Sequence, residues 1–125
     1  MTVPAGSVRA TLPATITERA FAVKVVALAH IYGWHAAHFR PARTEHGWRT
    51  AVGFDGAGFP DLVLVHSTRG LLWFRELKVG RNKLTTEQES WRDWLTGAVA
   101  NFDVWRPEQW ADIVSALSFG MALVI

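Results

Sequence analysis

The sequence predicts an α/β domain in which a mixed four-stranded sheet is flanked by helices. Long apolar runs behind capping signals predict the helices, and short apolar runs between turn signals predict the strands. The core elements follow one another in the order αβββαβα. At 125 residues, without repeats or a linker, the chain fits one domain with its own core. We expect an irregular arm over 1–14, the domain over 15–118 and an apolar tail over 119–125.

The first predicted helix follows the arm. Thr15-Ile16-Thr17-Glu18 fits a capping box, in which the side chains of the first and fourth residues bond to each other's backbone N–H. The run from Arg19 to Tyr32 that follows is apolar almost all round, which predicts a buried helix. Gly33 is expected to end it.

Strand signals fill the middle of the chain. His35 to Arg43 and Gly47 to Phe54 alternate loosely between apolar and polar residues, which predicts strands with poorly defined ends. Asp55 to Gly58 is a turn signal. Leu62 to Val65 then predicts a buried strand, and Leu71 to Val79 predicts the next one.

The C-terminal third predicts helix, strand and helix. Thr85-Thr86-Glu87-Gln88 offers overlapping capping boxes for a helix that runs to about Gly97. Asn101 to Arg106 predicts a short strand. Pro107 suits the first turn of the last helix, where its missing N–H costs nothing.

Composition limits the class of protein. The chain has no cysteine, which excludes disulfides and thiolate metal sites and fits a reducing cytosol. Its N-terminus lacks the basic and apolar regions of a signal peptide. The longest apolar tract, 113–125, is too short to span a bilayer. We therefore expect a cytoplasmic protein without a membrane span.

Basic residues gather in two segments, although the net charge is only +2. The first segment holds Arg40, Arg43 and Arg49, and the second holds Arg69, Arg75, Lys78, Arg81 and Lys83. Ten of the thirteen basic residues are arginine, which suits bidentate contacts to phosphate. A GC-rich genome would give the same excess of arginine, and the sequence leaves both explanations open.

Charged residues stand in unusual places in the two central strands. If these strands form an antiparallel hairpin centred between Thr68 and Arg69, Asp61 lies opposite Glu76. Directly opposed residues have Cβ atoms about 5 Å apart, so the two carboxylates could share one cation. Glu76 and Lys78 project from the same face, because side chains alternate along a strand.

Two readings of these charges remain open. Facing carboxylates at the end of a central strand repel each other unless a cation neutralises them. Oxygen ligands without cysteine favour Mg²⁺, with Mn²⁺ as a substitute. Alternatively, Glu76 and Lys78 form an ion pair at the strand end and Asp61 only caps a turn.

Four motifs in order resemble the VRR-NUC nucleases, the virus-type replication-repair nucleases of the PD-(D/E)xK superfamily. The motifs are Gly58-Phe59-Pro60-Asp61-Leu62-Val63, Glu76-Leu77-Lys78, Leu84-Thr85-Thr86-Glu87-Gln88-Glu89-Ser90-Trp91 and Val104-Trp105-Arg106-Pro107-Glu108-Gln109-Trp110. The resemblance extends from about Thr15 to Leu117 and implies a restriction-endonuclease-like core. The chain's small size is similar to that of the stand-alone phage and bacterial members, which implies a bacterial or phage origin.

The resemblance implies a role for each residue of the central motifs. Asp61 and Glu76 would bind the metal through their side chains, and Leu77 through its backbone carbonyl. Lys78 would position or deprotonate the attacking water. Glu18, an acid on the first helix, could join the metal site, or it could only complete the capping box with Thr15.

Gln88 has two explanations of the same kind. It stands three residues after Thr85, where a capping box places a glutamine, and it matches the family's glutamine behind the site. For DNA contacts we expect Arg40 and Arg43 at a rim, and Arg81 and Lys83 just beyond the catalytic strand.

The resemblance implies a Mg²⁺-dependent endonuclease that cuts branched DNA, such as a Holliday junction, as a homodimer and without a nucleotide cofactor. Alternatives are a nuclease acting on flaps or single strands and a DNA-binding module of the same fold that does not cut. A third alternative is a structural or membrane-surface protein anchored by 113–125.

Overall fold

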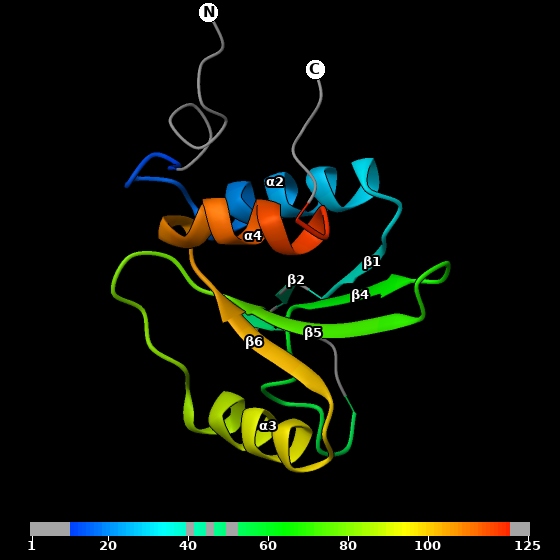
Figure 1. The fold of residues 1–125 in the computed structure, drawn as a ribbon. Coiled ribbons are helices and arrows are strands. Elements are labelled where there is room, and N and C mark those ends of the chain that lie inside the picture. Colours follow the sequence, from blue (N-terminus) through cyan, green and yellow to red (C-terminus); the bar gives the residue numbers. More distant parts are fainter. Residues whose placement is uncertain (1–10, 40–41, 45–46, 50–52, 121–125) are drawn as a thin grey trace, which may run out of the picture.

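The computed structural model describes residues 11–39, 42–44, 47–49 and 53–120, with only the main chain of 42–44 and 47–49 (Figure 1). Its main elements are α2 (Glu18–Ile31), β1 (His35–His38), β4 (Leu62–His66), β5 (Leu71–Leu77), α3 (Thr86–Gly97), β6 (Asn101–Trp105), the short 3₁₀ helix η1 (Pro107–Gln109) and α4 (Trp110–Leu117). The three α-helices and the sheet make an α/β fold, as the sequence predicts.

The sheet contains four strands in the order β1-β4-β5-β6. β1, β4 and β5 are antiparallel neighbours, whereas β6 runs parallel to β5. A parallel neighbour needs a crossover, and α3 provides it. Figure 1 shows α2 and α4 on one face of the sheet and α3 on the other. The predicted mixed sheet with flanking helices is therefore confirmed.

The predicted strands before Leu62 are shorter than expected. The strand predicted over 35–43 ends at His38 as β1, and Ala42–Thr44 forms a separate strand, β2. β2 pairs with β3 (Gly47–Arg49) as a two-stranded antiparallel hairpin. The strand predicted over 47–54 is wrong at its end, because Phe54 lies in a turn at a φ of 54°.

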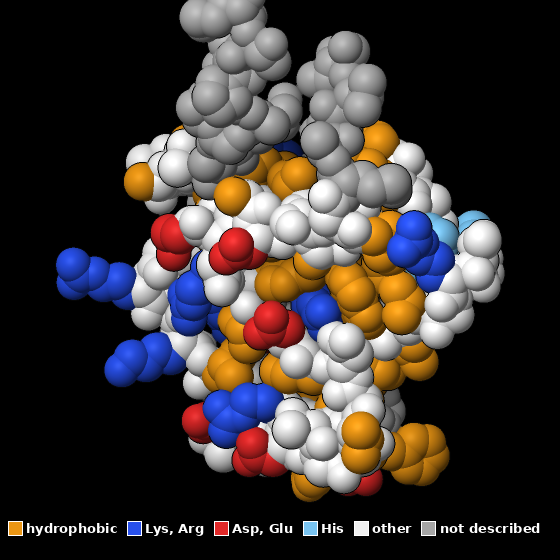
Figure 2. Space-filling view, in the orientation of Figure 1, with side chains coloured by type: hydrophobic (Ala, Val, Ile, Leu, Met, Phe, Trp, Pro, Cys, Tyr) orange, Lys and Arg blue, Asp and Glu red, His pale blue; other side chains and the backbone are white. Residues whose placement is uncertain are grey.

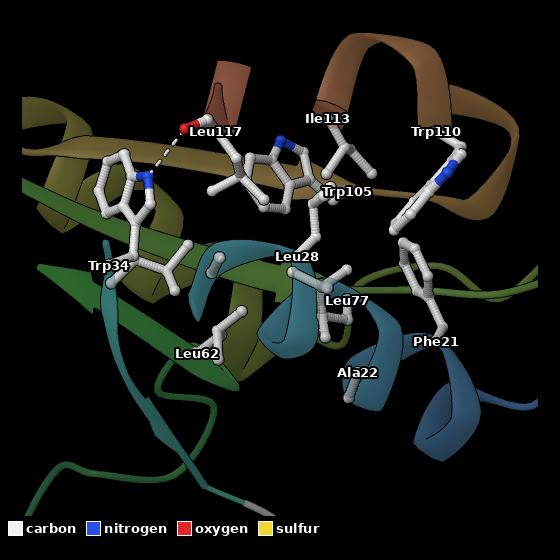
Figure 3. Close-up of a cluster of buried hydrophobic side chains, with 13 residues drawn as sticks. Phe21, Ala22, Leu28, Trp34, Leu62, Leu77, Trp105, Trp110, Ile113 and Leu117 are labelled. Carbon is white, nitrogen blue, oxygen red and sulfur yellow. Dashed lines mark hydrogen bonds between the residues drawn. The ribbon is translucent and has the colours of Figure 1, made fainter. Parts of the chain in front are cut away.

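The hydrophobic core lies between the sheet and the pair α2 and α4 (Figure 3). Phe21, Leu77 and Ile113 are fully buried there. Burial of each such side chain stabilises the fold by about 1.5–3 kcal/mol. Trp34 is also buried, and its Nε1 donates a hydrogen bond of 3.0 Å to the carbonyl oxygen of Leu117. This bond ties the start of β1 to the end of α4.

Helix α2 differs from the prediction in its cap and its burial. Its N-cap is Thr17, whose side chain accepts a hydrogen bond from the backbone of Ala20, so the predicted Thr15–Glu18 capping box is wrong. The predicted burial on all sides is also wrong, because Val23 is 60% exposed and Ile31 is 67% exposed. One face of the helix packs on the sheet, and the other remains uncovered among the described residues.

The second half of the chain follows the predicted boundaries closely. Thr85 caps α3 in a complete capping box, and β6 covers all but the last residue of its predicted range. Pro107 stands at the first turn of η1, which leads into α4. No helix among the described residues is both long enough and apolar enough to cross a membrane.

Candidate active site

The hairpin register is the one that the sequence predicts. Leu62 pairs with Arg75 and His66 with Leu71, so the next pair beyond the ladder is Asp61 and Glu76. β5 lies between β4 and β6, so Glu76 is on a central strand. The two carboxylates therefore come from neighbouring strands at one end of the sheet.

Asp61 is fixed from two sides. Its backbone oxygen accepts a hydrogen bond of 2.7 Å from the backbone N–H of Phe39, just beyond β1. Its side-chain Oδ2 accepts a hydrogen bond of 3.0 Å from the backbone N–H of Leu77. These contacts hold the carboxylate beside the Leu77 peptide, between Glu76 and Lys78.

Glu76 is the most unusual residue of the site, because it is a carboxyl group that is only 1% exposed. Its Oε2 accepts a hydrogen bond of 3.0 Å from Nε2 of Gln88 and lies 3.9 Å from Nζ of Lys78. Its other oxygen, Oε1, is buried without a hydrogen-bond partner. An ionised carboxylate with an unpaired buried oxygen is costly, so this atom calls for a proton or a cation.

Lys78 lies just past the end of β5 and is only 8% exposed. Its backbone N–H donates a hydrogen bond of 3.1 Å to the oxygen of Trp105, the last residue of β6. The pleat of the strand places its side chain on the same face as that of Glu76. The ammonium group therefore stands beside the Glu76 carboxyl group.

Gln88 closes the cap of α3 and also contacts the site. Its Oε1 accepts a hydrogen bond of 2.8 Å from the backbone N–H of Thr85, which completes the capping box of α3. Its Nε2 at the same time donates to Glu76. One amide thus starts the helix and orients a carboxyl group of the site.

Gly58 allows the loop before β4 to approach α3 closely. A Cβ at this position would lie 2.4 Å from the backbone carbon of Glu87 and 2.7 Å from the backbone nitrogen of Gln88. Its φ of +82° is also a conformation that favours glycine. Any side chain here would push the first turn of α3 away from the loop that carries Asp61.

The acids of the site perturb one another. Burial and then the neighbouring Asp61 carboxylate raise the pKa of Glu76 to about 9, against a smaller opposing effect of Lys78. Burial and then the charge of Asp61 also raise the pKa of Glu18, while Lys78 lowers it. Glu18, the first residue of α2, therefore lies close enough to Asp61 and Lys78 for their charges to act on it.

The site fits a hard divalent cation. Asp61 and Glu76 offer carboxylate oxygens, and the unpaired Oε1 of Glu76 lacks a partner that a cation would supply. Within the described residues, no three His, Cys, Asp or Glu side chains form a metal-binding group, so Glu18 does not complete a ready-made triad. A backbone carbonyl and water would complete the shell, which suits Mg²⁺ because this ion retains several waters.

The predicted DNA-contacting residues fall into two groups. Arg81 and Lys83 are exposed in the loop that joins β5 to α3. Figure 2 shows basic side chains projecting at the left edge, where Figure 1 places this loop. Arg40 lies outside the described residues, and Arg43 lies in β2, of which only the main chain is described.

Sequence reasoning placed Gly58 and Arg106 in its motifs but assigned neither the structural role that it has at the site. The structural role of Gly58 depends on a contact with α3, which has no local signal beyond the glycine itself. Arg106 contacts the loop of Arg81 and Lys83 from a position more than twenty residues away in the chain.

Comparison with protein-family models, curated proteins and solved structures gives no match for this chain. The resemblance seen in its motifs therefore stays a prediction. A function must be inferred from the arrangement of Asp61, Glu76, Lys78 and Gln88.

Proposed function

We propose that this protein is a Mg²⁺-dependent DNA endonuclease with a PD-(D/E)xK-type core. Three features support the proposal: the αβββαβα order of the sheet and its helices, the parallel β6 beside a central β5, and the motifs at Asp61 and Glu76-Leu77-Lys78. A fold alone hosts many functions, so the proposal depends on the site.

The observation that carries the proposal is a buried Glu76 opposite Asp61 and beside Lys78. A protein that needed only stability would gain little from this arrangement, because burying charges costs more than most ion pairs return. Perturbed acids with a specific charged neighbour are typical of catalytic sites.

In this mechanism Asp61, Glu76 and the Leu77 carbonyl would hold the Mg²⁺ ion. When bound, the ion supplies charge neutralisation and makes water more acidic. Lys78 orients the attacking water and stabilises the negative charge that develops on the phosphate oxygens. Gln88 keeps Glu76 in its orientation through the hydrogen bond from Nε2.

The resemblance favours branched DNA as the substrate and a homodimer as the active form. Two sites related by a twofold axis suit the symmetry of a four-way junction. The substrate panel below tests the preference for branched DNA.

The test is a cleavage assay with fluorescently labelled junction, flap, duplex and single-stranded DNA in Mg²⁺, Mn²⁺ or EDTA. We expect cutting only with a divalent cation. Asp61→Asn and Lys78→Met should each lower the rate by at least about 10²-fold, as expected for groups acting directly on the transition state. Lys78→Met should leave metal binding, measured by calorimetry, largely intact.

Two exposed residues provide matched controls. Asp103→Asn and Lys24→Met make the same chemical changes at exposed positions on β6 and α2 and should cut at the parental rate. If Asp61→Asn or Lys78→Met also cuts at that rate, the catalytic site is wrongly placed. DNA binding without cutting under every condition would favour the non-cleaving module.

A further inference from the structure

The segment 79–84, called here the basic loop, connects the two parts of the site. It begins after Lys78 and ends just before Thr85, the N-cap of α3. It carries Arg81 and Lys83, and no ion pair of either residue is found among the described residues. Figure 1 shows the loop standing out at the edge of the fold. A free cationic loop beside a phosphodiesterase site is placed to bind phosphates.

Arg106, the residue after β6, holds this loop through two hydrogen bonds. Its Nη1 donates a hydrogen bond of 3.3 Å to the oxygen of Gly80, and its Nη2 donates one of 2.7 Å to the oxygen of Asn82. The loop also closes on itself, because the N–H of Asn82 donates to the oxygen of Val79 at 3.2 Å. The two carbonyls on either side of Arg81 are thus held by one guanidinium group.

Arg106 is itself well anchored. Its backbone N–H donates a hydrogen bond of 2.9 Å to Oε1 of Gln109 in η1. The oxygen of the preceding residue, Trp105, accepts the bond from Lys78. The end of β6 therefore holds both the backbone of Lys78 and the loop that follows it.

We propose that the basic loop binds phosphates next to the scissile bond through Arg81 and Lys83, and that Arg106 positions it. This inference rests on the proposed function and deepens it. In this proposal Arg106 acts through the loop, because one N–H of each of its Nη atoms is used on a backbone oxygen of the basic loop.

The planar fork of arginine is needed for this role. Two nitrogens of one rigid group reach two carbonyls at once, whereas a lysine ammonium is a single point with a flexible stem. Arg106→Lys keeps the charge but loses the clamp. Arg106→Lys should therefore behave like Arg106→Gln and not like the parent protein. This result would distinguish a positioning role of Arg106 from a role of its positive charge alone.

The test is the affinity for a fluorescein-labelled four-way junction, measured by anisotropy in EDTA over a range of salt concentrations. The slope of log affinity against log salt is negative, and each phosphate contact adds about 0.9 to its magnitude. The double variant Arg81→Ala, Lys83→Ala should therefore have a slope that is shallower by about 2. At ~0.1 M salt this corresponds to about 60-fold weaker binding. Arg106→Gln and Arg106→Lys should each weaken binding by about tenfold, because a loose loop presents its charges poorly.

A double-mutant cycle decides between the two roles of Arg106. In the background of Arg81→Ala and Lys83→Ala, Arg106→Gln should have almost no further effect, because the loop no longer carries the charges that it positions. A full additional loss there would show that Arg106 contacts DNA itself and would overturn the proposal, as would parental affinity of Arg106→Lys. Arg92→Gln is the matched control, since Arg92 pairs with Glu89 and Asp93 on α3.

Hydrogen exchange of the amides in 79–84 provides a readout without DNA. Arg106→Gln and Arg106→Lys should speed exchange in this segment while circular dichroism stays unchanged, and unchanged exchange would refute the clamp.

Failure of the two proposals can be told apart. If the parent protein binds no DNA, the proposed function fails; if it binds DNA and the change of Arg81 and Lys83 has no effect, only this inference fails.

Discussion

Replacing Glu76 by Gln should make the metal-free protein more stable near neutral pH. The Glu76 carboxyl group is almost fully buried, and its pKa is raised from 4.5 to about 9, first by burial and then by Asp61. The folded protein therefore keeps a proton that the unfolded chain releases. Glutamine mimics the protonated form, since its oxygen can accept from Gln88 while its NH₂ group can donate toward Asp61.

The raised pKa determines the sign and the size of the effect. Between pH 4.5 and about 9 the unfolded state binds fewer protons at Glu76 than the folded state does. The free energy of unfolding therefore falls as pH rises, by about 1.4 kcal/mol per pH unit. Near pH 7 the accumulated loss is about 3 kcal/mol, and Glu76→Gln should recover most of it.

Urea denaturation in EDTA at several pH values measures this effect. The parent protein should lose stability from acidic to alkaline pH more steeply than Glu76→Gln, and the two curves should meet near pH 4.5. Glu89→Gln makes the same change at an exposed carboxylate on α3, so its curve should stay close to the parental one.

One result would refute the reasoning. If Glu76→Gln is no more stable than the parent protein at neutral and alkaline pH, and has the same slope, Glu76 does not retain its proton in the fold. The buried, facing arrangement of Asp61 and Glu76 would then be wrong.

Three further predictions test the site and the core. Gly58→Ala should lower the free energy of unfolding by more than about 2 kcal/mol and impair cleavage, because its Cβ meets the backbone of α3. Gly70→Ala, at a similar positive φ with no atom within 4 Å, should cost only about 1 kcal/mol in the same urea titration. Trp34→Phe should cost about 2 kcal/mol by leaving the Leu117 oxygen unpaired, and a loss below a few tenths would contradict the bond. Mn²⁺ should raise the melting temperature of the parent protein but not that of Glu76→Gln. The increase should be larger at alkaline than at neutral pH, because Mn²⁺ must displace the Glu76 proton when it binds at neutral pH.

The central hairpin could be predicted in detail from the sequence. Its strands are apolar and its turn is short, so the register follows from the midpoint between Thr68 and Arg69, and Asp61 meets Glu76 as expected. The helix cap at Thr85 can also be predicted from the sequence, because a capping box is a local signal. Features set by neighbours in the chain were thus predicted well.

Features that depend on tertiary contacts were predicted poorly. An apolar composition could not show that Val23 and Ile31 of α2 stay exposed, because burial depends on what packs against the helix. Thr15 and Thr17 both fit an N-cap, and only the packed helix selects Thr17. Sequence spacing also presented the two roles of Gln88 as alternatives, although one amide has enough donors and acceptors for both.

The double contact of Gln88 links the ionisation of the site to the order of a helix. α3 has no fully buried residue, and the hydrogen bond from Gln88 to Glu76 ties its first turn to the central strand of the sheet. The amide that closes its cap also donates to Glu76, and a charged acceptor strengthens such a bond. Loss of the Glu76 proton should therefore slow fraying at the start of α3, so that the helix end reports on the charge state of a carboxyl group in the sheet.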